Sequence, residues 1–152
     1  MKILFPGSFD PFTNGHADIL KRAQLMGFAP DVCFLDNPNK IRKFSEQAMI
    51  FAVGETFDVN VFASSDNLST VCARGQYKMV LRGLRNPMDF AYEQSMANYH
   101  KKYFNIETIF IPSTIDVSSS EVRELLKVGE LAKISNLVPK PIYNIIANDY
   151  ML

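Results

Sequence analysis

Short apolar runs alternate along the chain with stretches in which apolar residues recur at helical spacing. Each run spans three or four residues, and most are bounded by Pro or charged positions, which is typical of buried strands. The runs predict strands over residues 3–5, 32–35, 59–62, 79–81 and 108–111. The helical stretches predict helices over residues 17–26, 46–53, 67–74, 87–103 and 122–128, and a last helix over residues 139–152.

Several helix ends carry their own signals. Ser45 is a candidate N-cap, and Pro87 suits the first position of a helix. Gly27 is a candidate C-cap for the first helix. The run Ser118-Ser119-Ser120-Glu121 has the spacing of a capping box.

Strands alternating with helices predict an α/β fold with a parallel sheet covered on both faces. We expect one domain, residues 1–152, with a doubly wound, Rossmann-like sheet of about five strands. Right-handed crossovers would place the loops after the first, second, fourth and fifth strands at one edge of this sheet. Those four loops contain the residues discussed below.

Composition and charge exclude several classes of protein. The formal net charge is zero, so no global field favours nucleic acid or a membrane surface as a partner. No apolar run approaches the length of a membrane span. Cys33 and Cys72 lack metal-ligand spacing, and we expect both to be reduced core residues. The chain opens on a predicted strand, so we expect no leader and a cytoplasmic location.

The stretch from Phe5 to His16, F-P-G-S-F-D-P-F-T-N-G-H, joins the first strand to the first helix. A loop rich in Gly and Pro lets backbone N–H groups approach an anion, and the helix start adds free N–H groups and the positive end of its dipole. His16 at the helix start can donate to a phosphate oxygen. Gly7 and Gly15 as ordinary turn residues and His16 as a capping residue are the alternative.

Basic and hydroxyl residues follow three further strands. Lys40 and two other cations follow the second strand, Arg82 and Arg85 flank Gly83 after the fourth, and Ser118 opens the helix after the fifth. Arginine forks and helix-start N–H groups suit phosphate oxygens. The alternatives are a solvated basic loop, arginines paired with Asp89 or Glu93, and a plain capping box.

The stretch from Phe5 to His16 resembles the T/H-x-G-H signature of the nucleotidylyltransferase superfamily, which class I aminoacyl-tRNA synthetases share. Its form is most similar to phosphopantetheine adenylyltransferases. The most family-specific match is R-G-L-R at residues 82–85, followed by D-F-A-Y-E at residues 89–93. The motifs occur in the family's order over nearly the whole chain.

The resemblance implies transfer of AMP from ATP to 4′-phosphopantetheine, giving dephospho-coenzyme A and pyrophosphate, by a fold of the nucleotidylyltransferase type. It implies His16, Lys40 and Arg82 as catalytic residues, with Ser8 and Ser69 joining Lys40 and Arg82 at the acceptor. At ATP it implies a larger set: Ser8, Phe9, His16, Gly83, Leu84, Arg85, Glu93, Val117, Ser118, Ser119 and Ser120. Mg²⁺ would arrive with ATP, with no built-in metal site, and the family's hexamer is the expected assembly.

Some positions depart from the family's pattern. Ser8 replaces the commoner Thr, and Asp36 stands where a small or apolar residue is usual. Ser69 stands where a larger apolar residue is often found, and His100 stands where Asn is common. The segment 112–118 is about two residues short and lacks the aromatic residue that often precedes the Ser run. These departures bear on the adenine pocket and on the fit of the pantetheine arm.

Three alternatives remain open on the sequence alone. A nicotinamide mononucleotide adenylyltransferase would share the first and last motifs, but not R-G-L-R with D-F-x-Y-E. A class I synthetase fragment would carry K-M-S-K-S, which this chain lacks. A non-catalytic nucleotide-binding module would not need the full set of His16, Lys40, Arg82 and Arg85.

Overall fold

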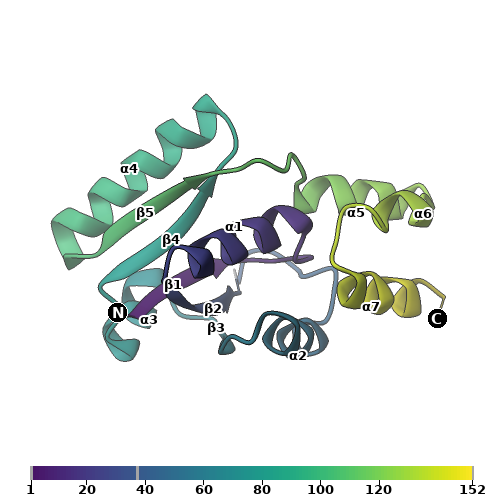
Figure 1. Cartoon of the computed structure of the whole chain (residues 1–152), viewed down its shortest axis with the longest axis horizontal. Helices are drawn as coiled ribbons and strands as arrows, with labels where there is room; N and C mark the ends of the chain where they lie inside the picture. Colours follow the sequence, from purple (N-terminus) through teal and green to yellow (C-terminus); the bar gives the residue numbers. More distant parts are fainter. Residues whose placement is uncertain (1, 37, 152) are drawn as a thin grey trace.

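The computed structural model describes residues 2–36 and 38–151, and a parallel sheet of five strands forms its middle layer (Figure 1). The strands are β1 (Lys2–Gly7), β2 (Ala29–Leu35), β3 (Val61–Ser64), β4 (Met79–Leu84) and β5 (Glu107–Pro112). Their order across the sheet is β3-β2-β1-β4-β5. The chain therefore adds β2 and β3 on one side of β1 and then β4 and β5 on the other side. Ligand crevices in doubly wound sheets form at such a reversal, here between β1 and β4.

Helices cover both faces of the sheet. They are α1 (Asn14–Leu25), α2 (Glu46–Phe57), α3 (Leu68–Gly75), α4 (Pro87–Phe104), α5 (Ser119–Lys127), α6 (Leu131–Ile134) and α7 (Lys140–Met151). Figure 1 shows α4 alongside β5 at one edge, and α5, α6 and α7 gathered at the end toward which β1 points. The predicted α/β class and the parallel five-stranded sheet are confirmed.

Two apolar clusters lie on opposite faces of β1. Ile3 and Phe5 pack in a cluster that reaches α1, α2, α5, α6 and α7. Leu4, between them, packs in a second cluster with Cys33, Cys72 and other residues from the α3 side. Alternation along one strand with both sets buried is the pattern of a sheet covered on two faces. The predicted burial of both cysteines is confirmed.

Local signals placed some helix ends correctly. Pro87 is the first residue of α4, and Gly27 takes a positive φ of 91° just after α1 and its C-cap Met26. Ser45 is the N-cap of α2, although its side chain makes no cap hydrogen bond. The short helix α6 was not expected from the sequence.

Several element boundaries differ from those expected, and three of these differences have a clear physical reason. Strand β4 extends to Leu84, because residues 82–84 pair with residues 110–112 of β5. Helix α1 begins at Asn14 rather than residue 17, because Thr13 caps it. Strand β3 lies two residues later than expected, since the N–H of Val59 still closes the end of α2 by donating to Gly54. Arg82 and Gly83 therefore lie on a strand, not in the loop after it.

Candidate active site

A cavity of about 280 Å³ opens at the carboxyl ends of β1 and β4. The segments that line it are the end of β1 with the loop after it, the start of α1, the end of β4, the start of α4 and the start of α5. Its lining residues are Phe5, Pro6, Gly7, Ser8, Phe9, Gly15, His16, Ile19, Arg82, Gly83, Arg85, Asp89, Glu93, Ser113, Val117, Ser118, Ser119 and Ser120. We call this the central cavity.

His16 is the third residue of α1 and forms a capping box with Thr13. The backbone N–H of Thr13 donates to Nδ1 of His16 at 3.0 Å. Because a backbone N–H can only donate, Nδ1 is an acceptor, and the proton of the neutral ring must sit on Nε2. His16 is thus a capping residue, as the alternative from the sequence predicted, and it also lines the central cavity.

The surroundings of His16 favour the neutral ring. Its ring contacts those of Phe9 and Phe12, with centroids 4.9 and 5.4 Å away. Burial, together with the charges of Arg82 and Arg85, lowers the pKa of His16 to about 3. His16 therefore presents a hydrogen-bond donor, not a positive charge, to a ligand near neutral pH.

Arg82 lies at the centre of the site with most of its guanidinium already in use. Its Nε and Nη2 donate to the two carboxylate oxygens of Glu93 at 3.0 and 2.7 Å. Its Nη1 donates to the carbonyl of Pro6 at 2.9 Å, which ties β4 to β1. These three bonds account for three of the five N–H donors of an arginine. The remaining two can meet an anion without breaking the pair.

Arg85 borders the same cavity from the loop before α4. Its Nε donates to Asp89 at 3.2 Å, one turn further along the chain. Asn86 caps α4 by accepting the N–H of Asp89 at 2.9 Å. Arg82 therefore pairs with Glu93 and Arg85 with Asp89, as the alternative from the sequence predicted. Both arginines still line the central cavity.

The start of α5 brings the Ser run to the cavity. Ser118 is the N-cap and accepts the N–H of Glu121 at 3.1 Å. Ser119 donates its hydroxyl to the carbonyl of Pro11 at 2.8 Å, and Ser120 accepts from Arg123 at 3.1 Å. The hydroxyls therefore hold local structure, while the first N–H groups of α5 have no helical acceptor. The expected reciprocal bond of a capping box at Glu121 is not formed within the described residues.

The shortened segment before the Ser run packs directly on α1. A Cβ added at Gly15 would lie 3.2 Å from the carbonyl oxygen of Val117. Thr114 in the same segment donates to Asp18 of α1 at 3.0 Å. The close approach at Gly15 lets the helix starts of α1 and α5 border one cavity.

Lys40 lies in a neighbouring cavity rather than in the central one. That cavity is lined by Ser8, Asp10, Leu35, Lys40, Ile41, Arg42 and Arg123. Ser8 lines both cavities, so they adjoin at the loop after β1. The structure does not bring Lys40 and Arg82 to one cavity.

A third, more apolar cavity adjoins the central one at Arg82. Its lining residues are Pro6, Leu35, Asn67, Leu68, Ser69, Val80, Arg82, Tyr92, Glu93, Met96, Ala97, Tyr99, His100 and Thr108. His100 is buried there, and burial lowers its pKa. Arg82 and Glu93 therefore separate a polar cavity from an apolar one, and Ser69 lies on the apolar side.

Comparison with known proteins agrees with this geometry. The sequence model of the cytidylyltransferase-like family matches residues 4–125. Phosphopantetheine adenylyltransferase of Prochlorococcus marinus (strain AS9601) is 36% identical over 151 residues, covering 93% of this chain and 94% of the relative. The enzyme of that name from Streptococcus pneumoniae (strain Taiwan19F-14) is 39% identical, with 96% and 94% covered. The one from Haemophilus influenzae (strain PittEE) is 32% identical, with 93% and 95% covered.

The chain belongs to the phosphopantetheine adenylyltransferases of the cytidylyltransferase-like family.

Solved structures support the fold of this adenylyltransferase at low sequence identity. Thermotoga maritima TmcAL, solved bound with alpha-thio ATP, has a TM-score of 0.70 at 14% identity, with 98% of this chain and 56% of that chain covered. A lipopolysaccharide core biosynthesis protein of Thermoplasma volcanium has a TM-score of 0.56 at 20% identity, with 76% and 98% covered. At such identities the likeness concerns the fold alone.

Most of the family-derived site residues line one of the three adjoining cavities of this adenylyltransferase. Leu84 does not line the central cavity: it ends β4, and its carbonyl accepts the N–H of Ser113 at 2.6 Å. Sequence reasoning missed three residues that shape the site, namely Asp10, Thr13 and Arg42. Asp10 and Thr13 lie inside the first motif and Arg42 inside the basic loop, so each was visible but had no assigned task.

Within residues 2–36 and 38–151, no three His, Cys, Asp or Glu side chains are grouped as metal ligands. In the same residues, no helix combines the length and apolar character needed to span a membrane.

Proposed function

We propose that this adenylyltransferase transfers AMP from ATP to 4′-phosphopantetheine and releases pyrophosphate. The observation that carries the proposal is the position of Arg82, which borders both the polar central cavity and the apolar cavity. A nucleotide's phosphates suit the first, and the uncharged arm of phosphopantetheine suits the second. The names of the three relatives described above support the same pair of substrates.

The reaction is an in-line displacement at the α-phosphorus of ATP. An oxygen of the acceptor phosphate forms a bond to phosphorus as the bond to the bridging oxygen of the β-phosphate breaks, and the leaving group is pyrophosphate. A phosphomonoester has a second pKa of about 6, so its nucleophilic oxygen is already ionised near neutral pH. The protein therefore needs to supply positioning and charge stabilisation rather than a general base.

His16 is suited to act on the α-phosphate. With Nδ1 occupied by the N–H of Thr13, its Nε2–H points a neutral donor at a cavity that holds anions in this proposal. The donor can strengthen its bond to a non-bridging oxygen as charge builds up in the transition state. No proton has to leave His16 for the reaction to proceed.

The starts of α1 and α5 would hold the nucleotide's phosphates. Residues at both helix starts line the central cavity, where the helix dipole favours negative charge. In α1 the N–H of Asn14 donates to Leu137 and that of His16 to Thr13, so these two N–H groups are already bonded within the protein. Arg85 and the N–H groups of Ser119 and Ser120 would receive the leaving pyrophosphate. The substrate would be the magnesium complex of ATP, in which the cation bridges phosphate oxygens and needs few protein ligands.

Arg82 and Lys40 would hold the acceptor phosphate from two sides. Arg82 keeps two N–H donors beyond those bonded to Glu93 and Pro6, and Ser8 lines both its cavity and that of Lys40. The exposed ammonium of Lys40 sits on a flexible stem and can follow the phosphate. The pantetheine arm would then run past Ser69 and His100.

We also propose that the protein acts as a homo-oligomer, with the family's hexamer as the expected form, in the cytoplasm. Helix α4 carries large side chains that a lone copy leaves exposed: Met88 by 84%, Tyr92 by 65% and Tyr103 by 62%. An apolar helix face of this kind supports an interface with another copy. Light scattering coupled to gel filtration would measure the assembly, and a monomeric mass would contradict it.

Pyrophosphate release from purified protein tests the proposed reaction. The assay would contain ATP and magnesium with 4′-phosphopantetheine, pantetheine or nicotinamide mononucleotide. We expect release with 4′-phosphopantetheine only, since pantetheine lacks the nucleophile. Release with nicotinamide mononucleotide instead would contradict the proposal and indicate a nicotinamide mononucleotide adenylyltransferase. No release with any acceptor, together with ATP binding, would favour a nucleotide-binding module.

A further inference from the structure

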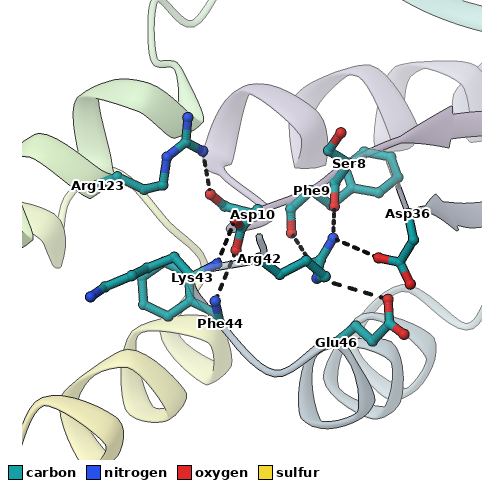
Figure 2. Close-up of polar contacts among 9 residues, drawn as sticks. All are labelled: Ser8, Phe9, Asp10, Asp36, Arg42, Lys43, Phe44, Glu46 and Arg123. Atoms are coloured by element: carbon teal, nitrogen blue, oxygen red, sulfur yellow. Dashed lines mark hydrogen bonds and ion pairs between the residues drawn. The ribbon is translucent and has the colours of Figure 1, made fainter. Parts of the chain in front are cut away.

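Two arginines hold three consecutive carbonyl groups of the loop after β1 (Figure 2). Arg42 donates through Nη1 to Ser8 at 2.6 Å and through Nη2 to Phe9 at 3.2 Å. Arg123 donates through Nη1 to Asp10 at 2.6 Å. The loop whose N–H groups border the central cavity is thus fixed from its opposite side.

Two carboxylates hold Arg42 in place. Asp36 Oδ1 lies 3.7 Å from Nη1 of Arg42, and Glu46 Oε2 lies 3.8 Å from its Nε. Oδ1 of Asp36, Nε of Arg42 and Oε2 of Glu46 are buried and have no hydrogen-bond partner within the described residues. Charge attraction, and not hydrogen bonding, therefore links Arg42 to both carboxylates. Burial and the neighbouring Asp36 raise the pKa of Glu46, whereas the charge of Arg42 acts to lower it. The guanidinium also lies over the ring of Phe34, 5.6 Å from its centroid.

The backbone held by Arg42 is an unusual one. Phe9 has a φ of 49°, in the left-handed region that bulky residues rarely adopt. Such a conformation persists only where its surroundings enforce it. The ring of Phe9 packs against Phe34 and His16, while Arg42 holds the carbonyls on both sides of this residue.

The direction of these carbonyls sets the direction of the neighbouring N–H groups. In a trans peptide the C=O and the following N–H point in opposite directions. Because the carbonyl of Ser8 points at Arg42, the N–H of Phe9 points away from Arg42. Ser8 and Phe9 both line the central cavity, whereas Arg42 lines the neighbouring one. Successive N–H groups around a left-handed residue form a concave site for an anion.

The same cluster joins the loop after β1 to the loop that carries Lys40. The carboxylate of Asp10 accepts the N–H of Lys43 at 2.8 Å and that of Phe44 at 3.0 Å (Figure 2). Arg42 is the residue before this anchor, and Lys40 lies two residues earlier. Any movement of Arg42 away from Ser8 therefore also shifts the segment that presents Lys40.

We propose that Arg42 is a positioning residue for phosphoryl transfer: it aims the N–H of Phe9 at the nucleotide's phosphate and sets the place of Lys40 relative to that site. It touches no substrate itself and acts through the peptide groups of Ser8 and Phe9. Asp36 and Glu46 contribute by holding its guanidinium. The proposal rests on the adenylyl transfer proposed above, and it assigns a task to Asp36 as a departure from the family's pattern.

Steady-state kinetics on Arg42→Met and Arg42→Lys test the proposal. Arg42→Met keeps most of the side chain's volume and removes both carbonyl bonds. We expect kcat to fall about 10–100-fold, because the N–H of Phe9 is then misaligned in the transition state. Acceptor KM should rise several-fold, because Lys40 also shifts. Arg42→Lys should be intermediate, because an ammonium cannot hold two carbonyls in a fork. Two control variants are Arg74→Met, an exposed arginine paired with Asp66, and Ile146→Ala, a buried residue of α7.

Amide hydrogen exchange gives a readout that does not need turnover. We expect the amides of Lys43 and Phe44 to exchange about ten-fold faster in Arg42→Met than in the wild type or in Ile146→Ala, because the two loops separate more often. If wild type releases no pyrophosphate, the proposed function fails, but the exchange measurement still tests Arg42, because unchanged exchange at Lys43 and Phe44 would contradict its hold on the two loops. Wild-type kcat and KM in Arg42→Lys and Arg42→Met would overturn the proposal. So would a loss of kcat matched by the equally destabilised Ile146→Ala.

Discussion

The backbone N–H of Thr13 donates to Nδ1 of His16 at 3.0 Å, and this bond decides which ring nitrogen of His16 carries a proton. The cap of α1 therefore also prepares the donor that faces the central cavity. One capping box serves helix stability and the chemistry of the site together.

His16→Ala should lower kcat by about 10²–10³-fold, as the loss of one oxyanion-type donor does in other enzymes. ATP affinity should change much less, because the donor strengthens its bond mainly in the transition state. The measurement is kcat together with ATP binding by calorimetry. A variant with near-normal kcat would remove His16 from the mechanism.

The stability of the protein should fall as the pH drops from about 6.5, the pKa of His in an unfolded chain. Burial lowers the pKa of both His16 and His100 in the folded protein, that of His16 to about 3. Protons then bind the unfolded chain first, so stability present above pH 6.5 is lost progressively below it. Chemical denaturation at pH 7.5, 6.5 and 5.5 measures this, with His16→Gln as the comparison. If the free energy of unfolding of His16→Gln fell equally with pH, the loss of stability would come from other groups.

Ser119→Pro should impair ATP binding far more than Ser119→Ala. Ser119 is the first residue of α5 and follows an extended Ser118 with φ −120° and ψ 154°, so a proline fits the backbone there. Both variants lose the hydroxyl bond to Pro11, which is worth about 1 kcal/mol. Only the proline also removes the N–H expected to bind phosphate. Equal ATP dissociation constants for the two variants would contradict a role for this N–H.

Lys40→Ala should raise KM for 4′-phosphopantetheine about ten-fold or more, because a charge-assisted contact is worth about 1.5–3 kcal/mol. KM for ATP should barely move. Lys43→Ala is the matched control, since it lies in the same loop and Figure 2 shows its ammonium pointing away from Ser8 and Arg42. If Lys43→Ala raised acceptor KM as much as Lys40→Ala, general loop charge would explain the effect.

Arg82→Lys should impair turnover although it keeps the charge. An ammonium cannot donate to both oxygens of Glu93, to Pro6 and to a phosphate at once. We expect kcat over KM for the acceptor to fall about 10-fold or more, in line with the loss of charge-assisted bonds. A value close to that of the wild type would remove the forked contact from the proposed acceptor site.

The order of strands and helices and several helix ends could be predicted from the sequence because they depend on residues close together in the chain. Pro87 at the start of α4 and Gly27 after α1 act through their own backbone preferences. The apolar runs need only be short and buried to specify a parallel sheet with helices on both faces. The Gly and Pro content of the Phe5–His16 stretch, from which we predicted a phosphate site, is also a matter of local composition.

Contacts between distant segments decided the rest. Strand β4 reaches Leu84 because β5 offers hydrogen-bond partners there, and the pair of Arg82 with Glu93 depends on how α4 folds back. In the sequence, Arg42 is one more cation in a basic loop. Only the fold places it against the carbonyl of Ser8, 34 positions earlier. Lys40 and Arg82 line different cavities for the same reason: strand order places their loops at one edge, but only side-chain packing determines which cavity each borders.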